Sequence, residues 1–346
     1  MDNSRLNKRP QAVTMRDVAR KANVSQSTVS RIISGTDSKI PISEETRQKV
    51  MHAIQEMGYH PNQYARSLRG SKIHMIGMVI ADIGNPFYHP MVRAVQDIAL
   101  QNGYDVMIAN SDHMREKEML FCESIVRRPV DGVIMIPYHL TDQNLENLIQ
   151  RTGVTISAVG NHIRHPDIDV TFADDFKATY ETIRWLIDVK KHQRIAMIHA
   201  SRIFPVTVRR ASAFYKAMEE SNLPVPKEYV IERDWEVKTG QEGIKSLLSL
   251  PNPPTAVFCA SDTIAIGALE MAETLGVRVP QDIAIVGFDD IPAASWVRPR
   301  LSTIAQHPDQ MGFYLANSLF ERLRGEYSGP GRRFEVPCEL IIREST

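Results

Sequence analysis

The polar side chains between residues 26 and 31 are of types that read base edges in DNA. They are Gln26, Ser27, Ser30 and Arg31. A glutamine amide can form paired hydrogen bonds with adenine, and an arginine guanidinium can do the same with guanine. Val29, Ile32 and Ile33 fall on the other side of a helix at this spacing, so they can face a core while the polar residues face outward.

A short preceding helix would hold this stretch in place. Thr14 followed by Asp17 predicts a helix N-cap with a carboxylate in the first turn. Asn23 interrupts the helical pattern, and Ser25 can cap the second helix. Two short helices joined by a tight polar turn are typical of a DNA-reading helix-turn-helix. The same residues also fit an ordinary helical hairpin with a solvated basic face.

The charge distribution favours a polyanionic partner for the N-terminal part alone. The 346-residue chain has a formal net charge of zero, but residues 1–72 hold 13 Lys/Arg against 6 Asp/Glu. A basic head on an acidic body indicates that the head meets nucleic acid. The composition, with 43% hydrophobic and 24% charged residues, is that of a globular protein, and the length predicts two or three units.

A third helix would complete a small head over residues 13–60. Ser43 would cap this helix, Val50, Ile54 and Met57 repeat at helical spacing, and Gly58 would end it. Three short helices around one apolar centre form a minimal domain.

Two flanking segments are polar and basic. Residues 1–12 are expected to form a disordered arm. Residues 61–71 have little apolar periodicity, and a helix this short does not form alone in water. They are therefore either a plain linker or a segment that folds on a partner, with Arg66 and Arg69 at the phosphates.

Residues 14–70 resemble the DNA-binding head of the lactose/galactose repressor family of bacterial transcription regulators. The matching residues are Asp17-Val18-Ala19, Val24-Ser25, Thr28-Val29-Ser30-Arg31, the run 43–50, and Gly58-Tyr59-x-Pro61-Asn62-x-x-Ala65. The resemblance implies that Gln26, Ser27 and Arg31 read major-groove base edges. It also implies a hinge helix over residues 62–69, with Leu68 opening a base step from the minor groove; packing of Leu68 on the core is the alternative. The residues assigned to DNA contact are Thr14, Ser25, Gln26, Ser27, Thr28, Ser30, Arg31, Asn62, Ala65, Leu68 and Arg69.

From residue 73 onward, apolar strands alternate with amphipathic helices. Two such series predict two doubly wound α/β lobes with parallel sheets. A helix near 310–324 should return to the first lobe and a strand near 335–342 to the second, so that the chain crosses between lobes three times. The expected first lobe spans 72–172 and 304–332, and the second 173–303 and 333–346. Here the resemblance extends to the type I periplasmic-binding-protein fold.

Polar and aromatic residues follow the strand ends, where ligands bind in such sheets. Among these residues the family resemblance implies ligand contact for Asn85, Phe87, Tyr88, Arg210, Trp235, Asp262 and Asp289, which are the ligand-binding candidates. Carboxylates, guanidinium groups and flat aromatic faces suit a polyhydroxylated ligand. Phe87 could instead serve lobe packing, and Asp262 could instead be a helix cap. The resemblance adds three weaker candidates, which are Asn161, Phe172 and Gln306.

The effector class stays open at this point. Residues 201–208 form a loop that is bulkier and more apolar than the usual counterpart in the family. A sugar or sugar derivative is favoured, while a sugar acid, a purine and a nucleoside are alternatives.

Enzymatic activity is not expected. The sequence has no G-x-S-x-G, G-x-x-x-x-G-K-[ST], G-x-G-x-x-G or H-E-x-x-H motif, and its histidines and cysteines lack metal-ligand spacing. We therefore expect neither a metal nor a cofactor. Three cysteines, an odd number, indicate free thiols in a reducing compartment.

The N-terminal residues lack an apolar region, and we expect no membrane segment and a cytoplasmic location at the nucleoid. A solute-binding protein is the remaining alternative, but it would need an export signal and would have no use for residues 14–70. The expected protein is a homodimeric, effector-responsive transcription regulator that binds a palindromic DNA operator. A repressor of carbohydrate or related catabolic genes is favoured.

Overall fold

The computed structural model describes residues 13–34, 41–59 and 72–346. The chain divides into two compact units, Met1–Ile73 and His74–Thr346. The arm expected over residues 1–12 and the hinge expected over residues 61–71 lie outside the described residues.

The first unit contains the three expected helices, α1 (Met15–Lys21), α2 (Gln26–Ser34) and α3 (Glu44–Met57). Thr14 forms a capping box with Asp17, in which each residue's side chain accepts the other's backbone N–H. Ser43 caps α3, and Gly58 ends it in the left-handed conformation at φ 59°.

A small apolar core joins these helices. Val18, Val29 and Val50, one from each helix, are fully buried. The remaining buried members of this core are Ala19, Ala22, Ile32, Ala53 and Tyr59. The helical spacing therefore predicted correctly which side of each helix faces inward.

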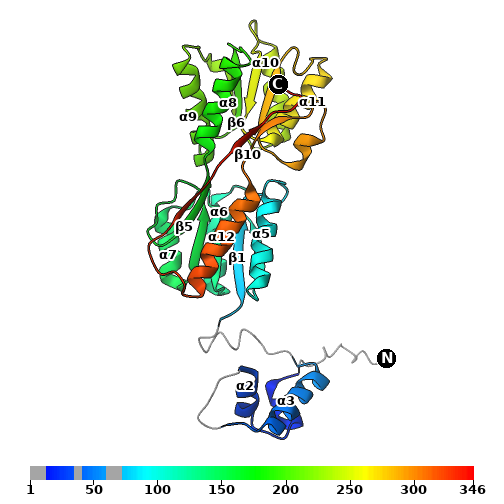
Figure 1. Cartoon of the computed structure of the whole chain (residues 1–346), viewed down its shortest axis with the longest axis vertical. Coiled ribbons are helices and arrows are strands. Elements are labelled where there is room, and N and C mark those ends of the chain that lie inside the picture. Colours follow the sequence, from blue (N-terminus) through cyan, green and yellow to red (C-terminus); the bar gives the residue numbers. More distant parts are fainter. Residues whose placement is uncertain (1–12, 35–40, 60–71) are drawn as a thin grey trace, which may run out of the picture. The chain divides into compact units, whose positions relative to one another are not determined.

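The second unit consists of two α/β lobes, each built on a six-stranded sheet (Figure 1). The first lobe has the strand order β11-β5-β4-β3-β1-β2, and all of its pairings are parallel. Its strands are β1 (Met75–Ile80), β2 (Asp105–Asn110), β3 (Gly132–Met135), β4 (Thr155–Val159), β5 (Asp169–Ala173) and β11 (Arg333–Val336). Its helices are α5 (Tyr88–Gln101), α6 (Arg115–Arg127), α7 (Asp142–Thr152) and α12 (Pro308–Leu323).

The second lobe has the strand order β12-β10-β9-β8-β6-β7, in which only β12 runs antiparallel to its neighbour. Its strands are β6 (Ile195–Ala200), β7 (Val230–Arg233), β8 (Ala256–Cys259), β9 (Ala284–Asp289), β10 (Ser302–Ala305) and β12 (Glu339–Ile341). Its helices are α8 (Asp175–Asp188), α9 (Pro205–Glu220), α10 (Val237–Leu248) and α11 (Asp262–Thr274), with short 3-10 turns at Lys227–Tyr229 and Pro292–Ser295.

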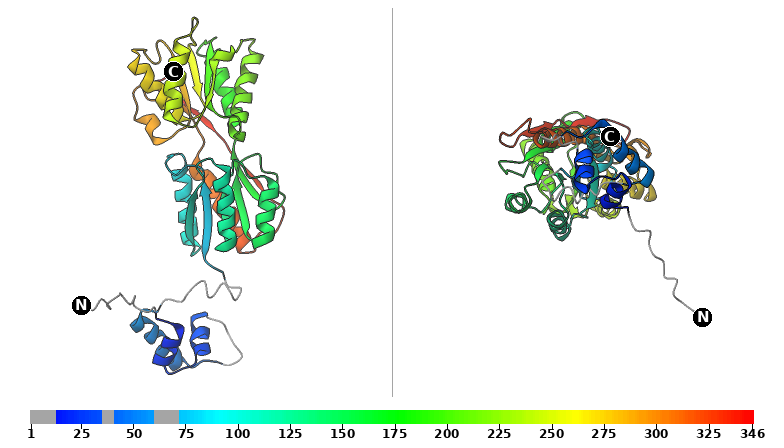
Figure 2. Two further views of the ribbon diagram at one scale, coloured as in Figure 1. Left: turned by 180° about the vertical axis from the view of Figure 1, so that it is seen from behind. Right: turned by 90° about the horizontal axis from the view of Figure 1, so that it is seen from below.

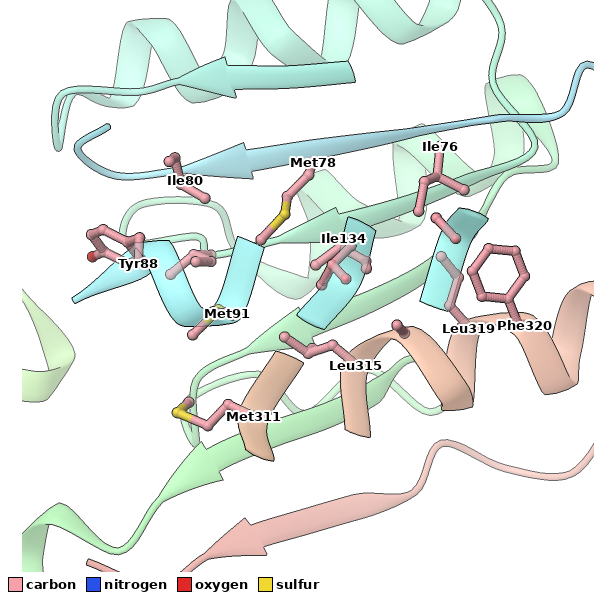
Figure 3. Close-up of a cluster of buried hydrophobic side chains, with 14 of the residues drawn as sticks. Ile76, Met78, Ile80, Tyr88, Met91, Ile134, Met311, Leu315, Leu319 and Phe320 are labelled. Atoms are coloured by element: carbon pink, nitrogen blue, oxygen red, sulfur yellow. The ribbon is translucent and has the colours of Figure 1, made fainter. Parts of the chain in front are cut away.

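Both faces of the first-lobe sheet are covered by helices, as parallel sheets require. Ile76, Met78 and Ile80 of β1 pack against α5 and α12 (Figure 3). Val79, pointing the other way, packs against α6 and α7. This period-two burial explains why β1 is almost continuously apolar.

The C-terminal segment differs from expectation. The single strand expected over 335–342 is two short strands, and the first of them, β11, pairs with β5 in the first lobe. Residues 333–336 therefore do not belong to the second lobe. Pro337, which has no N–H to donate, separates β11 from β12, and the chain passes between the lobes at this point (Figure 1, Figure 2). With α12 packed on α5 of the first lobe, the chain makes the three expected crossings.

Two strands were not anticipated. β5 and β10 are short and contain polar residues, so they lack the apolar run that marks the other strands. β5 pairs with β4 and with the distant β11, and β10 pairs with β9 and with the distant β12.

Candidate functional sites

The polar stretch of the head lies on α2, with Gln26 and Ser27 exposed and Ser30 and Arg31 half-buried. Val29 on the opposite side anchors the helix in the head core. Gln26 and Ser27 are therefore placed outward, and the assignment of the DNA contacts stays a prediction.

The other assigned head residues have structural positions at helix starts. Thr14 caps α1, and the Ser25 hydroxyl accepts a hydrogen bond of 3.1 Å from the Thr28 N–H at the start of α2. Exposed hydroxyls at helix N-termini can also contact phosphates. Asn62, Ala65, Leu68 and Arg69 lie outside the described residues.

A cavity of ≈ 110 Å³ lies between the two lobes of the second unit, at the carboxyl ends of their strands. One water molecule needs about 10–15 Å³ on this measure, so the cavity has room for a small organic molecule. Six of the seven predicted ligand-binding residues line it, namely Asn85, Phe87, Tyr88, Arg210, Trp235 and Asp289. The three weaker candidates, Asn161, Phe172 and Gln306, line it as well.

Arg210 and Asp289 are two of the charged groups at the second-lobe side of the cavity. Arg210 is 3% exposed; its Nη1 donates to the Ala260 carbonyl at 2.5 Å, and its guanidinium lies 3.5 Å from the centre of the Phe288 ring. Asp289 accepts a 2.5 Å hydrogen bond from Gln306 Nε2. Burial raises the pKa of Asp289 to about 7, against the opposing effects of Arg210 and Gln306.

The backbone at Asp289 is also unusual, with φ at 120°. Non-glycine residues rarely adopt this region, and such strain concentrates at functional positions. The conformation directs the Asp289 side chain from the end of β9 to the cavity.

Two buried donors of the cavity lining have no acceptor among the described residues. They are Nε of Arg210 and the indole Nε1 of Trp235. Buried N–H groups without partners are costly, so each of these two donors adds a local penalty within the wall of the cavity.

Asp262 does not line the cavity. It is fully buried at the start of α11, where it accepts hydrogen bonds from Thr303 Oγ1 at 2.5 Å and from the Ile291 N–H at 2.9 Å. Burial and the neighbouring Asp289 raise its pKa well above the usual value. Its role is to join α11 to β10 and to the turn after β9, while the preceding Ser261 faces the cavity.

The cavity also contains residues that the sequence did not single out. These are chiefly His113, Tyr138, Asp175 and Arg209. Asp175 and Arg209 form an ion pair of 2.6 Å, and the Tyr138 hydroxyl lies 3.0 Å from that of Tyr88. His113 and Tyr138 follow the ends of β2 and β3, so the strand-end rule applied to every strand would have found them.

The segment 201–208, which was expected as a loop, reaches this site; from Pro205 onward it forms the first turn of α9. Pro205 and Val206 line the cavity, while Ile203 is 65% exposed and Phe204 is buried. This bulky apolar segment therefore contributes a wall to the site.

The described residues offer neither a metal centre nor a membrane-spanning helix. Residues 13–34, 41–59 and 72–346 contain no group of three His, Cys, Asp or Glu side chains arranged to hold a metal ion. Within the same ranges, no helix is long and apolar enough to cross a membrane.

Comparison with known proteins identifies the two units separately. Residues 14–62 match the family described as bacterial regulatory proteins, lacI family, and residues 186–346 match the periplasmic binding protein-like domain. The transcriptional repressor CytR of Escherichia coli (strain K12) is 32% identical over 340 residues, covering 98% of each chain.

Solved structures give the same result over the whole length. The crystal structure of the lac repressor dimer bound to operator and the anti-inducer ONPF matches with a TM-score of 0.81 at 26% identity, covering 97% of this chain and 99% of the other. A complex of the transcriptional regulator CelR with cellobiose matches with a TM-score of 0.71 at 26% identity, covering 96% and 100%. The chain belongs to the lacI family of bacterial regulatory proteins: it is a transcription regulator with a helix-turn-helix head and a periplasmic-binding-protein-like effector domain.

Proposed function

We propose that this regulator is a repressor whose effector is a small hydroxyl-bearing ring compound, of the sugar class, bound between the two lobes. The observation that carries the proposal is the grouping of Arg210, Asp289 and Trp235 at one cavity. An ionised carboxylate accepts hydrogen bonds from sugar hydroxyls, a guanidinium donates to sugar oxygens, and an indole face covers the apolar face of a sugar ring. The structure of CelR with cellobiose provides a related regulator with a bound sugar.

A nucleoside or purine is the second candidate. Phe87, Phe172 and Trp235 bring three flat aromatic faces to the cavity lining. Such faces stack on a heterocyclic base as well as on a sugar.

The proposed regulatory mechanism links the cavity to the head. In a homodimer on a near-palindromic operator, each head reads one half-site. An effector that contacts both lobes changes their relative angle, and residues 61–71 transmit the change to the heads. A coupling of about 1–3 kcal/mol would change operator affinity by roughly 5–150-fold. Because the operator is chromosomal DNA, the proposed location is the cytoplasm.

The effector is tested by calorimetric titration of the full chain with sugars, sugar acids, nucleosides and purines. We expect a member of the sugar class to bind, and Arg210→Gln to weaken that binding at least tenfold, because the exchanged side chain no longer supplies a charged donor. Arg202→Gln is the matched control, since Arg202 is exposed and paired with Glu232 outside the cavity lining.

Two results would contradict the proposal. One is the absence of binding by any compound of the panel. The other is equal affinity of the Arg210→Gln variant and the unmodified protein. Binding of a nucleoside or purine alone would establish the second candidate. Gel-shift titrations of an operator selected from random DNA, with and without the effector, then show whether the effector weakens or strengthens operator binding.

A further inference from the structure

Phe204 of the second lobe lies among rings of the first lobe. It immediately precedes α9 and is 6% exposed, although its neighbour Ile203 is 65% exposed. Its ring centre lies 5.6 Å from that of His113, 5.5 Å from Tyr138 and 5.8 Å from His139. We call these three first-lobe residues the socket. Trp235 of its own lobe lies 6.0 Å from Phe204 on another side.

The socket is held in shape by hydrogen bonds inside the first lobe. Glu118 of α6 is fully buried, and its carboxylate accepts the backbone N–H groups of Tyr138, His139 and Leu140 at 2.8, 3.1 and 3.0 Å. The His139 ring lies 2.8 Å from the His113 carbonyl oxygen through Nε2. Because these hydrogen bonds already fix the socket, it loses little conformational entropy when Phe204 packs against it.

The geometry of the contacts is that of attractive ring pairs. The interplanar angles between Phe204 and the socket rings are 64°, 78° and 61°, which are edge-to-face arrangements. Such pairs at centre distances of about 4.5–7 Å are favourable beyond the burial of their surface. All three contacts join one lobe to the other.

We propose that Phe204 and the socket form a latch that holds the two lobes together. The proposal does not depend on the effector's identity. Tyr138 and Trp235, which touch Phe204, also line the cavity. The latch therefore also fixes two walls of the cavity, and an effector that changes the angle between the lobes acts on the latch contacts.

Hydrogen–deuterium exchange of the full chain without effector tests the latch. We expect Phe204→Ala to speed exchange in the first-lobe segments 111–115 and 136–141 by at least about 2- to 10-fold, since the loss of a single aromatic pair already gives this factor. Helix α7 lies in the same lobe but carries no socket residue, so its exchange should not change. Ile203→Ala is the matched control, and it should leave all of these segments as they are.

One result overturns the latch: unchanged exchange in 111–115 and 136–141, with any effect of Phe204→Ala confined to residues 201–210. If Phe204→Ala raises exchange throughout the chain because it fails to fold, the reciprocal first-lobe variant His139→Ala decides. A latch requires His139→Ala to speed exchange in the second-lobe segment 201–208, and no change there refutes it.

Discussion

Replacing Asp289 by asparagine should remove a pH dependence from effector binding. Burial raises the pKa of Asp289 to about 7, and the residue lines the cavity. Hydroxyl groups bind best to an ionised carboxylate, and with such a pKa the ionised fraction is about 9% at pH 6 and about 91% at pH 8. The affinity of the unmodified protein for its effector should therefore rise about tenfold over this interval, or about 1.4 kcal/mol.

The assay is calorimetric titration at pH 6, 7 and 8 with the compound identified by the ligand panel. The Asp289→Asn variant should bind more weakly at pH 8 and with nearly the same affinity at all three values. Equal affinities of the unmodified protein at pH 6 and pH 8 would refute the reasoning. A pH dependence that survives in Asp289→Asn would assign the titration to another group, such as His113 of the cavity lining, whose pKa is lowered by burial, or Asp262, whose pKa is raised.

The same carboxyl group affects folding without any effector. Its pKa in the folded state lies above the ordinary value of 3.8, so its contribution to the free energy of unfolding is present at low pH and is lost as the pH rises through about 7. Asp289→Asn should therefore gain stability relative to the unmodified protein between pH 5 and pH 8. Thermal unfolding at both values measures this, and a difference that does not vary with pH would contradict it.

Three further substitutions test other parts of the chain. Gln26→Ala should weaken operator binding by about 1–3 kcal/mol in gel-shift titrations without altering effector affinity, whereas Gln55→Ala on α3 should leave both unchanged. Gly240→Ala should lower the free energy of unfolding in urea by at least about 1–3 kcal/mol, because the added Cβ would lie 1.8 Å from a backbone oxygen of α11. The control Lys245→Ala, at an exposed position of the same helix, should leave the free energy of unfolding nearly unchanged. Asp169→Asn should lower the free energy of unfolding by about 3–5 kcal/mol, because the fully buried carboxylate binds two arginine side chains that would lose their counter-charge. A loss under about 1 kcal/mol would show that these ion pairs are dispensable for stability.

The sequence alone predicted the three helices of the head and the α/β class of the second unit. Thr14, Ser43 and Gly58 mark helix ends through local interactions, because an N-cap side chain or a glycine in the left-handed conformation acts on backbone groups only a few residues away. The two series of alternating strands and helices predicted two doubly wound lobes. Six of the seven predicted ligand-binding residues line the cavity; they were assigned from the family resemblance and from their positions after strands, since the carboxyl ends of parallel strands meet at one edge of a sheet.

Only the tertiary structure decided the points that depend on distant partners. Asp262 has the residue type and the position of a ligand contact, but Thr303 and the Ile291 N–H occupy its carboxylate within the protein. β11 joins the first lobe because β5 offers it a free edge there, which no property of residues 333–336 reveals. The burial of Phe204 likewise follows from rings supplied by the other lobe. Sequence patterns report which face of an element is apolar, whereas pairing and contact across the lobes depend on which groups the complete fold brings within reach.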